Sequence, residues 1–220
     1  MDEFDFVDHY GEAEETAQSN QLPDNEVECA LNCAFVGVGG GGGKLAKAFL
    51  DLGFKKTLLI NTTEKDQPDG VDEEHLVLIP DADGVAKNIE YGKDVFTRNG
   101  AVVEDALRTK LGNVDWLFVL AGGGGGTGSA CFALDQVFQR YLNSVNGGGK
   151  VFYIMTWPSS QELLNTTITN NAVSLANDIK NAPHIVLDNE KQIKFLRGKV
   201  GMMNLFPTAN TAFAKLLSQT

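Results

Sequence analysis

The chain has 220 residues, of which 43% are hydrophobic and 21% charged. This is the composition of a soluble globular protein with one large domain or two small ones. It contains no run of eighteen apolar residues, and its N-terminus lacks the basic-then-apolar pattern of a signal peptide, so we expect no membrane insertion. Three cysteines without a CxxC pair predict reduced thiols in a cytoplasmic protein.

The net charge of −11 is concentrated at the N-terminus. Residues 1–28 contain ten acidic residues and no Lys or Arg, which leaves a net charge of −1 for the rest of the chain. Such a segment buries too little apolar surface to offset the entropy lost on ordering, so we expect an acidic disordered tail. The remainder shows no basic stripe, which argues against direct binding of nucleic acid.

After the tail, apolar runs alternate with amphipathic segments. The apolar runs predict strands at 31–37, 57–61, 75–79, 114–120, 150–156 and 184–188. The other segments predict helices at 44–53, 99–112, 128–145, 160–180, 188–198 and 202–220. Continuous apolar strands separated by helices indicate the α/β class, with a Rossmann-like, doubly wound parallel sheet.

Two glycine-rich segments, 37–43 and 122–128, each follow a strand and precede a helix. Ligands of doubly wound sheets bind at the carboxyl ends of the strands, where both segments are expected to lie. Glycine lets the backbone approach phosphates without a Cβ in between, and helix starts present N–H groups to anions. We therefore predict one polyphosphate site rather than a flexible spacer. Its candidate contacts are Gly39, Gly40, Gly41, Lys44, Gly123, Gly124, Gly125, Gly126, Thr127, Gly128 and Ser129.

Two commoner phosphate motifs fit the first segment poorly. Gly37, Gly39 and Gly42 satisfy GxGxxG, but Asn61 stands at the end of the second strand where a dinucleotide fold has an acid. A Walker A loop is excluded because Val38 replaces its first glycine and Leu45 replaces its Ser or Thr. Neither a dehydrogenase nor an ordinary ATPase is favoured.

The second segment, AGGGGGTGSA, resembles the tubulin signature loop, and FVGVGGGGGKLA is similar to the first phosphate loop of FtsZ. LLINTTEKD resembles the second loop of that family, and GVAKNIEYGKDVF the third, which closes on the terminal phosphate. The resemblance to the tubulin/FtsZ superfamily covers about residues 31–220. The segments PSSQELLNTTITN and IVLDNEKQIKF look closer to TubZ, the plasmid- and phage-borne branch.

The resemblance implies several further contacts to a guanine nucleotide. Asn61 and Asn88 belong to the second and third loops, Glu162 matches the ribose-binding acid, and Asn189 and Asn204 match base-reading positions. Three of them have an alternative explanation: Glu162 as an acid at a helix start, and Asn189 and Asn204 as helix caps. Two departures from the family are that Val85, Ala86 and Lys87 replace third-loop glycines, and that Thr166 replaces an arginine near the phosphates.

The implied function is a GTPase that forms head-to-tail protofilaments, binds GTP or GDP with Mg²⁺, and positions DNA or phage through a DNA-bound adaptor protein. We expect Mg²⁺ to be held mostly by phosphate oxygens and water, and we name no catalytic residue. In the family, an acidic loop of the next subunit completes hydrolysis, and that loop lies beyond the central helix in which this chain ends. We expect a GTP-binding domain at 29–200, the start of the central helix at 201–220, and a truncated form. The alternatives are a cell-division protein, a nucleotide-free interaction module and a Rossmann oxidoreductase.

Overall fold

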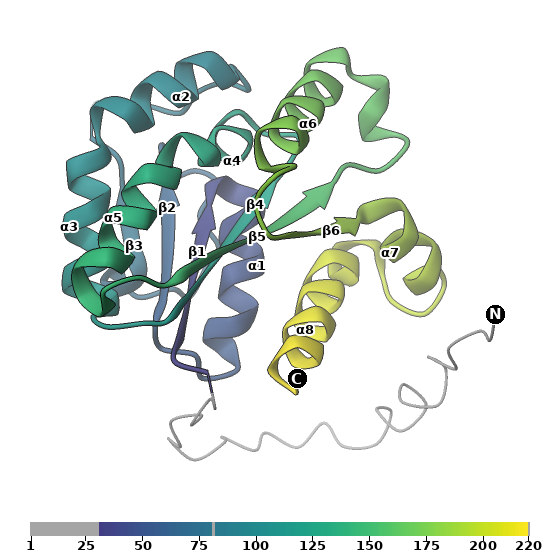
Figure 1. Ribbon diagram of the computed structural model, residues 1–220. Helices are drawn as coiled ribbons and strands as arrows, with labels where there is room; N and C mark the ends of the chain where they lie inside the picture. The colour runs from purple at the N-terminus through teal and green to yellow at the C-terminus, as the bar shows by residue number, and fades with distance from the viewer. Residues whose placement is uncertain (1–30, 81, 220) are drawn as a thin grey trace.

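The computed structural model in Figure 1 describes residues 31–80 and 82–219, so the predicted acidic tail at 1–28 lies outside the described residues. Six parallel strands form a sheet in the order β3-β2-β1-β4-β5-β6. They are β1 (Cys33–Val38), β2 (Thr57–Asn61), β3 (Leu76–Leu78), β4 (Trp116–Gly122), β5 (Lys150–Trp157) and β6 (His184–Asp188). The order reverses between β1 and β4, which is the arrangement of a doubly wound sheet and confirms the predicted fold class.

Eight α-helices lie in the described part of the chain. They are α1 (Gly39–Asp51), α2 (Ile89–Arg98), α3 (Gly100–Leu111), α4 (Gly126–Ser129), α5 (Asp135–Asn146), α6 (Thr166–Ile179), α7 (Asn189–Leu196) and α8 (Leu205–Ser218). Four short 3-10 turns accompany them: η1 (Glu73–His75), η2 (Cys131–Leu134), η3 (Glu162–Leu164) and η4 (Met202–Asn204). None of these described helices is long and apolar enough to cross a bilayer.

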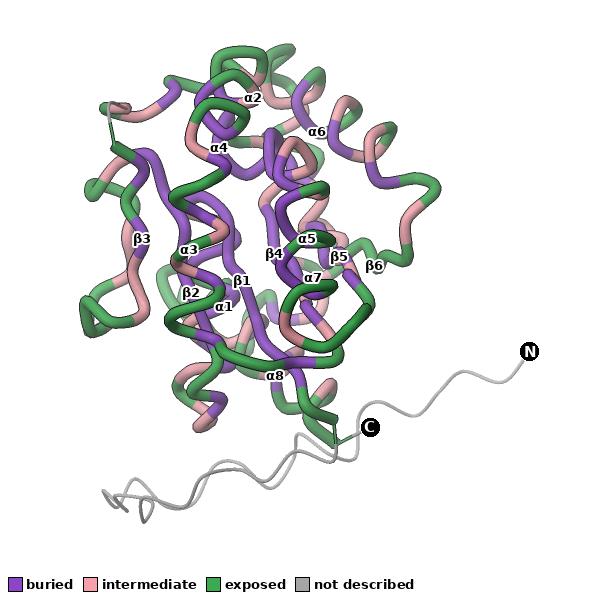
Figure 2. The backbone as a smooth tube through the Cα atoms, turned by 60° about the vertical axis from the view of Figure 1, so that its left-hand side comes forward, coloured by how far each residue is buried: buried purple, intermediate pink, exposed green. Residues whose placement is uncertain are grey.

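The helices cover both faces of the sheet, because alternate residues of each strand point to opposite sides. Ala34, Val36 and Val38 of β1 belong to a core shared with α2, α3, α5 and α6. Phe35 of β1 faces the other way and stacks on Phe49 of α1, in a core that also includes residues of α8. Figure 2 shows the consequence: the central strands β1 and β4 are buried, whereas β6 at one edge is largely exposed.

The structure differs from the predicted elements in three places. Helix α1 begins at Gly39, so the first glycine segment is the start of a helix rather than a loop. The segment at 84–96, predicted as a loop, contains most of α2, whose N-cap is Asn88. The predicted long helix at 128–145 is divided into α4, η2 and α5.

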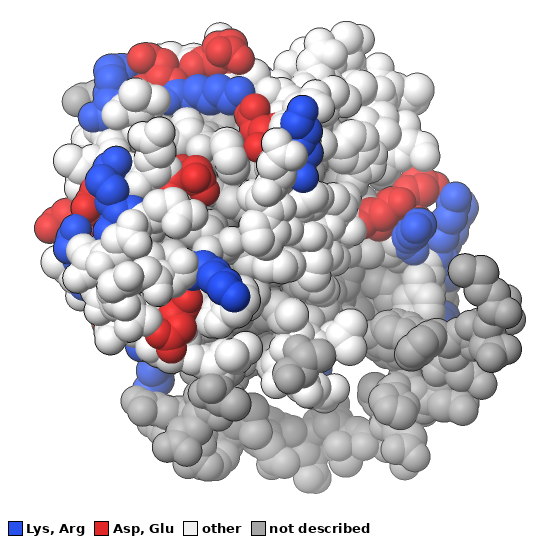
Figure 3. Space-filling view, in the orientation of Figure 1, with Lys and Arg blue, Asp and Glu red and all other residues white. Residues whose placement is uncertain are grey.

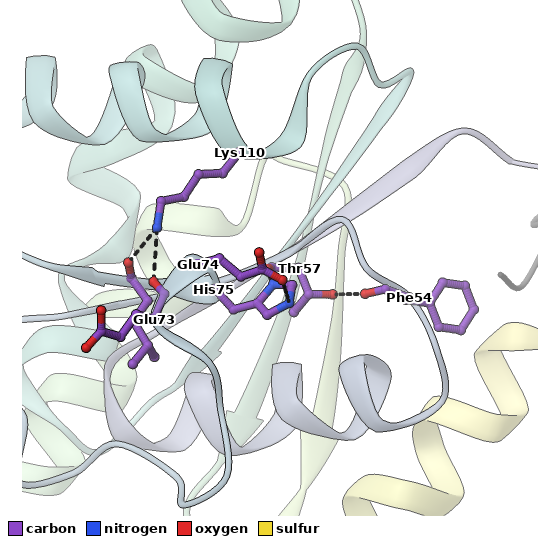
Figure 4. A network of polar contacts seen from close by, with 7 residues as sticks. Phe54, Thr57, Glu73, Glu74, His75 and Lys110 are labelled. Atoms are coloured by element: carbon purple, nitrogen blue, oxygen red, sulfur yellow. Dashed lines mark hydrogen bonds and ion pairs between the residues drawn. The ribbon is translucent and has the colours of Figure 1, made fainter. Parts of the chain in front are cut away.

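A polar network fixes the edge strand β3 to the body of the protein (Figure 4). Lys110 of α3 donates from Nζ to the carbonyl oxygens of Glu73 and Leu76, at 3.2 and 3.0 Å. On the other side, Nδ1 of His75 lies 2.8 Å from the carbonyl oxygen of Thr57 in β2. These contacts lie at the amino-terminal ends of β2 and β3 and complement the short ladder between the two strands.

On the face drawn in Figure 3, acidic and basic side chains of the described residues form small mixed groups. Salt bridges between described residues include those of Glu104 with Arg108 and Arg140, at 2.8 and 2.9 Å. The hydrogen bond from Arg108, followed by that from Arg140, lowers the pKa of the Glu104 carboxyl. No continuous basic stripe crosses this face of the described part.

The start of α1 packs directly on the backbone of β4 at Gly42. A Cβ atom at Gly42 would lie 2.1 Å from the carbonyl oxygen of Leu120, a contact that no side chain permits. One residue further along, a Cβ at Gly43 would make only ordinary contacts, the nearest at 3.5 Å to Leu59. Close backbone packing therefore outweighs the low helix propensity of glycine at position 42.

We expect Gly42→Ala to lower the free energy of unfolding by at least about 2 kcal/mol, because the added methyl group forces α1 away from β4. Gly43→Ala is the matched control, and should be neutral or stabilising by up to about 1 kcal/mol, since alanine favours the helix. Urea unfolding followed by circular dichroism measures both. Equal stability of the two variants would contradict the packing described here.

Candidate functional site

A cavity of about 710 Å³ opens at the carboxyl ends of the strands, a volume typical of small-molecule and cofactor sites. Residues that follow each of the six strands line it, together with residues of η4 and α8. It contains most of the predicted site residues: Gly40, Gly41, Lys44, Gly123, Gly124, Gly125, Gly126, Thr127, Gly128, Glu162 and Asn189. Segments far apart in the sequence thus meet at one place, the switch point of the sheet.

The start of α1 provides one wall of the cavity. Its N-cap, Val38, has an extended backbone and makes no side-chain capping bond. The first backbone N–H groups of a helix have no partner within the helix, so an uncapped start is suited to an anion. Gly40, Gly41 and the exposed Lys44 line the cavity here, and no ion pair joins Lys44 to another described residue.

The segment after β4 provides the opposite contact for α1. A Cβ at Gly41 would lie 3.3 Å from Cα of Gly122, and one at Gly128 would lie 2.7 Å from the Gly122 carbonyl oxygen. Gly39, with φ of +70°, would meet the amide nitrogen of Gly128 at 2.7 Å. Close packing between the two glycine segments therefore explains several of these glycines without a ligand.

Gly125 is different from its neighbours. It lines the cavity, its backbone is extended (φ −85°, ψ 159°), and a Cβ there would meet nothing within 4 Å. Neither packing nor backbone conformation requires glycine at this position. A side chain here would instead occupy open space in the cavity.

A buried pair of hydroxyl groups joins the loop after β2 to the segment after β4. Oγ1 of Thr62, which is fully buried, lies 2.8 Å from Oγ1 of Thr127 at the start of α4. Thr127 borders the cavity, whereas Thr62 follows β2 directly. The pair keeps two walls of the cavity in register.

Five predicted site residues lie outside the cavity lining: Asn204 at the start of α8, and four that pack or hydrogen-bond elsewhere in the protein. Asn61 is buried and its side-chain oxygen accepts from the amide of Thr62 at 2.8 Å. Asn88 caps α2 by accepting from the amide of Tyr91 at 3.0 Å. Gly39 and Ser129 are buried between the two glycine segments, and the Ser129 hydroxyl lies 3.5 Å from the Gly122 carbonyl oxygen. Their positions give these four a structural role.

Glu162 and Asn189 both line the cavity. The Glu162 carboxylate accepts from the amide and hydroxyl of Ser159, each at 2.8 Å, which orders the loop after β5. Asp188, not Asn189, caps α7 by accepting from the amides of Glu190 and Lys191. The Asn189 side chain is therefore not occupied in capping.

Asn204 is the residue whose predicted role the geometry disfavours. It stands at the N-cap of α8 without a side-chain capping bond, and is not among the residues that line the cavity. Phe206 and Asn210, one helical turn apart, line the cavity instead. The sequence places Asn204 and Asn210 in one segment, and only the position of α8 shows which of them lines the cavity.

Two further lining residues were not singled out in the sequence. Asp66 follows β2 and packs beside the start of α1, where a Cβ at Gly40 would lie 2.9 Å from the Asp66 Cβ. Phe206 is 40% exposed, so its ring is available to a planar ligand. The sequence offered two signals for these residues. Asp66 is an acid within the segment that resembles the second loop, and Phe206 is an aromatic residue one helical turn before Asn210.

Two ionisable groups near the site have shifted pKa values. The backbone amide of Ser160, at 3.1 Å, lowers the pKa of the Glu190 carboxyl and ties the loop after β5 to α7. Burial raises the pKa of the Cys131 thiol, which lies in the core behind α4. Burial of this kind makes a thiol a poor nucleophile.

Comparison with solved structures gives close matches to this fold. CetZ from Methanosaeta thermophila superposes with a TM-score of 0.70 at 23% identity, over 85% of this chain and 53% of CetZ. A GTPγS-form protofilament of Bacillus thuringiensis TubZ gives 0.72 at 20%, over 90% and 58%. FtsZ from M. jannaschii gives 0.67 at 19%, over 86% and 53%. No family model and no curated protein matches the sequence.

The chain has the fold of the tubulin/FtsZ GTPase domain, as the sequence resemblance predicts. TubZ structures are among those it matches. The chain spans between 53% and 58% of the length of the three structures compared.

The hydroxyl pair gives an asymmetric prediction. Thr127→Val leaves the Thr62 hydroxyl buried without its partner, which costs about 1–3 kcal/mol of unfolding free energy. Thr62→Val costs less, because the remaining Thr127 hydroxyl borders the cavity and can be hydrated. The double variant should lose less than the sum of the two. Urea unfolding of all four proteins tests this, and strictly additive losses would show that the hydroxyls do not interact.

Proposed function

We propose that this chain is the nucleotide-binding part of a filament-forming GTPase of the plasmid or phage type. The observation that carries the proposal is the cavity at the switch point, into which both glycine segments open. Helix starts and backbone N–H groups favour the anionic phosphates there. The comparison with TubZ in its GTPγS form supports the same ligand class.

The cavity residues suggest how a guanine nucleotide binds. The phosphates would lie against Gly40, Gly41 and the segment 123–127, with Lys44 as a counter-charge. Glu162 would meet the ribose, and the amides of Asn189 and Asn210 would pair with the guanine edge through donor and acceptor. The ring of Phe206 is available to stack on the base.

Mg²⁺ fits this site as a companion of the phosphates. The described residues contain no group of three or more His, Cys, Asp or Glu side chains able to hold a metal by themselves. Mg²⁺ commonly binds through one or two carboxylates together with phosphate oxygens and water. Asp66, beside the start of α1, is the carboxylate that would take part.

Assembly and biological role are part of the proposal. Several of the matched TubZ structures are protofilaments, which supports head-to-tail self-association of this chain. We propose that hydrolysis is completed by a neighbouring subunit and that the filament positions DNA or phage through a DNA-bound adaptor. A dilute monomer should accordingly hydrolyse GTP slowly, and light scattering with GTP and Mg²⁺ on the longest natural form would test assembly.

The direct test of the proposal is nucleotide selectivity. Calorimetric titration of the purified chain should show binding of GTP and GDP. The affinity for ATP should be lower by about tenfold or more, because adenine presents the wrong hydrogen-bonding edge to Asn189 and Asn210. Absence of binding by all three nucleotides would refute the proposal. Equal affinity for ATP and GTP would refute the assignment of the base.

Gly125→Ala separates ligand contact from stability. The added methyl group enters open space in the protein, so the unfolding free energy should change by less than about 0.5 kcal/mol. It also enters the space assigned to the phosphates, so affinity for GTP should fall about tenfold or more. Full affinity in a correctly folded Gly125→Ala protein would place the phosphates elsewhere.

A further inference from the structure

The third loop, residues 84–88, forms a wall of the cavity through Gly84, Val85, Ala86 and Lys87. Among the described residues, Ala86 and Lys87 are the non-glycine residues with positive φ, at +47° and +63°. The left-handed region is unfavourable for residues with a Cβ. Such strain persists where the surrounding structure imposes it, and it concentrates at ligand sites.

Asn171 of α6 imposes this conformation from one side. Its side chain is 3% exposed, and Nδ2 donates to the carbonyl oxygen of Lys87 at 2.8 Å. The same Nδ2 lies 3.4 Å from the carbonyl oxygen of Gly124. One buried amide thus connects the loop after β3 with the loop after β4.

Gly126 supports the loop from the other side. A Cβ there would lie 2.6 Å from Cγ2 of Val85 and 2.9 Å from Cα of Lys87. The segment 122–128 therefore contacts α1 at Gly122 and the third loop at Gly126. A polyphosphate that followed this segment away from α1 would reach Lys87, which lines the same cavity.

Lys87 is exposed, lines the cavity, and forms no ion pair with another described residue. Lys44, at the α1 wall, is likewise exposed, lines the cavity and forms no ion pair with another described residue. A lysine ammonium is a compact charge that binds phosphate well. The two lysines thus provide positive charge at two different walls of one anion site.

We propose that Lys87, held in place by Asn171, is a specificity residue that makes the cavity prefer a nucleoside triphosphate to a diphosphate. Lys87 is the binding residue, and Asn171 is a positioning residue that acts through the Lys87 backbone. The inference rests on the proposed function and extends it to the terminal phosphate. The departure from the family's glycines at 86 and 87 then supplies a charge in place of a bare backbone.

The test is a set of titrations of the full chain with GTP, GDP and inorganic tripolyphosphate. Lys87→Met should weaken GTP and tripolyphosphate about tenfold and GDP less than about threefold, because only the terminal phosphate loses its counter-charge. Lys87→Arg should retain most of the preference. Lys180→Met, which removes an exposed lysine at the end of α6, is the charge-matched control and should change nothing.

Asn171→Leu should lower the ratio of GTP to GDP affinity in the same direction as Lys87→Met. Its control is Asn165→Ala, which removes the N-cap of the same helix, where Asn165 accepts from the amides of Thr167 and Ile168. That variant weakens α6 without touching the third loop, so its affinity ratio should equal that of the wild type. Should Asn171→Leu fail to fold, the Lys87 variants decide the matter alone.

An unchanged affinity ratio in Lys87→Met, or equal weakening of GTP and GDP, would overturn the inference while leaving the proposed function intact. Lys87-dependent binding of tripolyphosphate without binding of GTP or GDP would refute the guanine nucleotide and support the role of Lys87. A wild-type chain that binds none of the three ligands would refute both.

Discussion

The contact between two backbones at the ends of β1 and β4 is the constraint on which the rest of this structure depends. Helix α1 begins immediately after β1 and lies so close to β4 that Gly42 faces the Leu120 carbonyl oxygen with no room for a Cβ. Gly39 and Gly128 meet in the same way one turn earlier. The backbone N–H groups at the start of α1, which have no partner within the helix, therefore lie at the switch point of the sheet. Ligands of doubly wound folds bind there.

The walls of the cavity are joined to one another by buried polar contacts rather than by apolar packing alone. The Thr62–Thr127 hydroxyl pair joins the loop after β2 to the segment after β4. The Asn171 amide joins the loop after β3 to that same segment. Buried polar groups of this kind are costly when unpaired, so each pair favours a single relative position of its two loops. The cavity is consequently preorganised, and a preorganised site loses less entropy when a flexible ligand binds.

The strands and their parallel order could be predicted because a strand buried on both faces reads as a continuous apolar run, as VDWLFVL does. The glycine segments pointed to the cavity. Packing also accounts for Gly42 and Gly128, whereas a Cβ at Gly125 would meet no neighbour within 4 Å. Sequence reasoning missed α2, since its amphipathic face is interrupted by Gly92, which packs on Ala130. Asn171 and Asn210 gave no local signal, because their roles depend on which loops and which face of α8 meet them. The division into a domain at 29–200 and a central helix at 201–220 stays a prediction.

A crystal structure of the chain grown with GTP and Mg²⁺ tests the central claim most directly. The account predicts phosphate oxygens within hydrogen-bonding distance of backbone amides from both glycine segments, at Gly40–Gly41 and within 123–127, with the base toward Asn189 and Asn210. A nucleotide that contacts only one segment, or lies outside the cavity altogether, would contradict it.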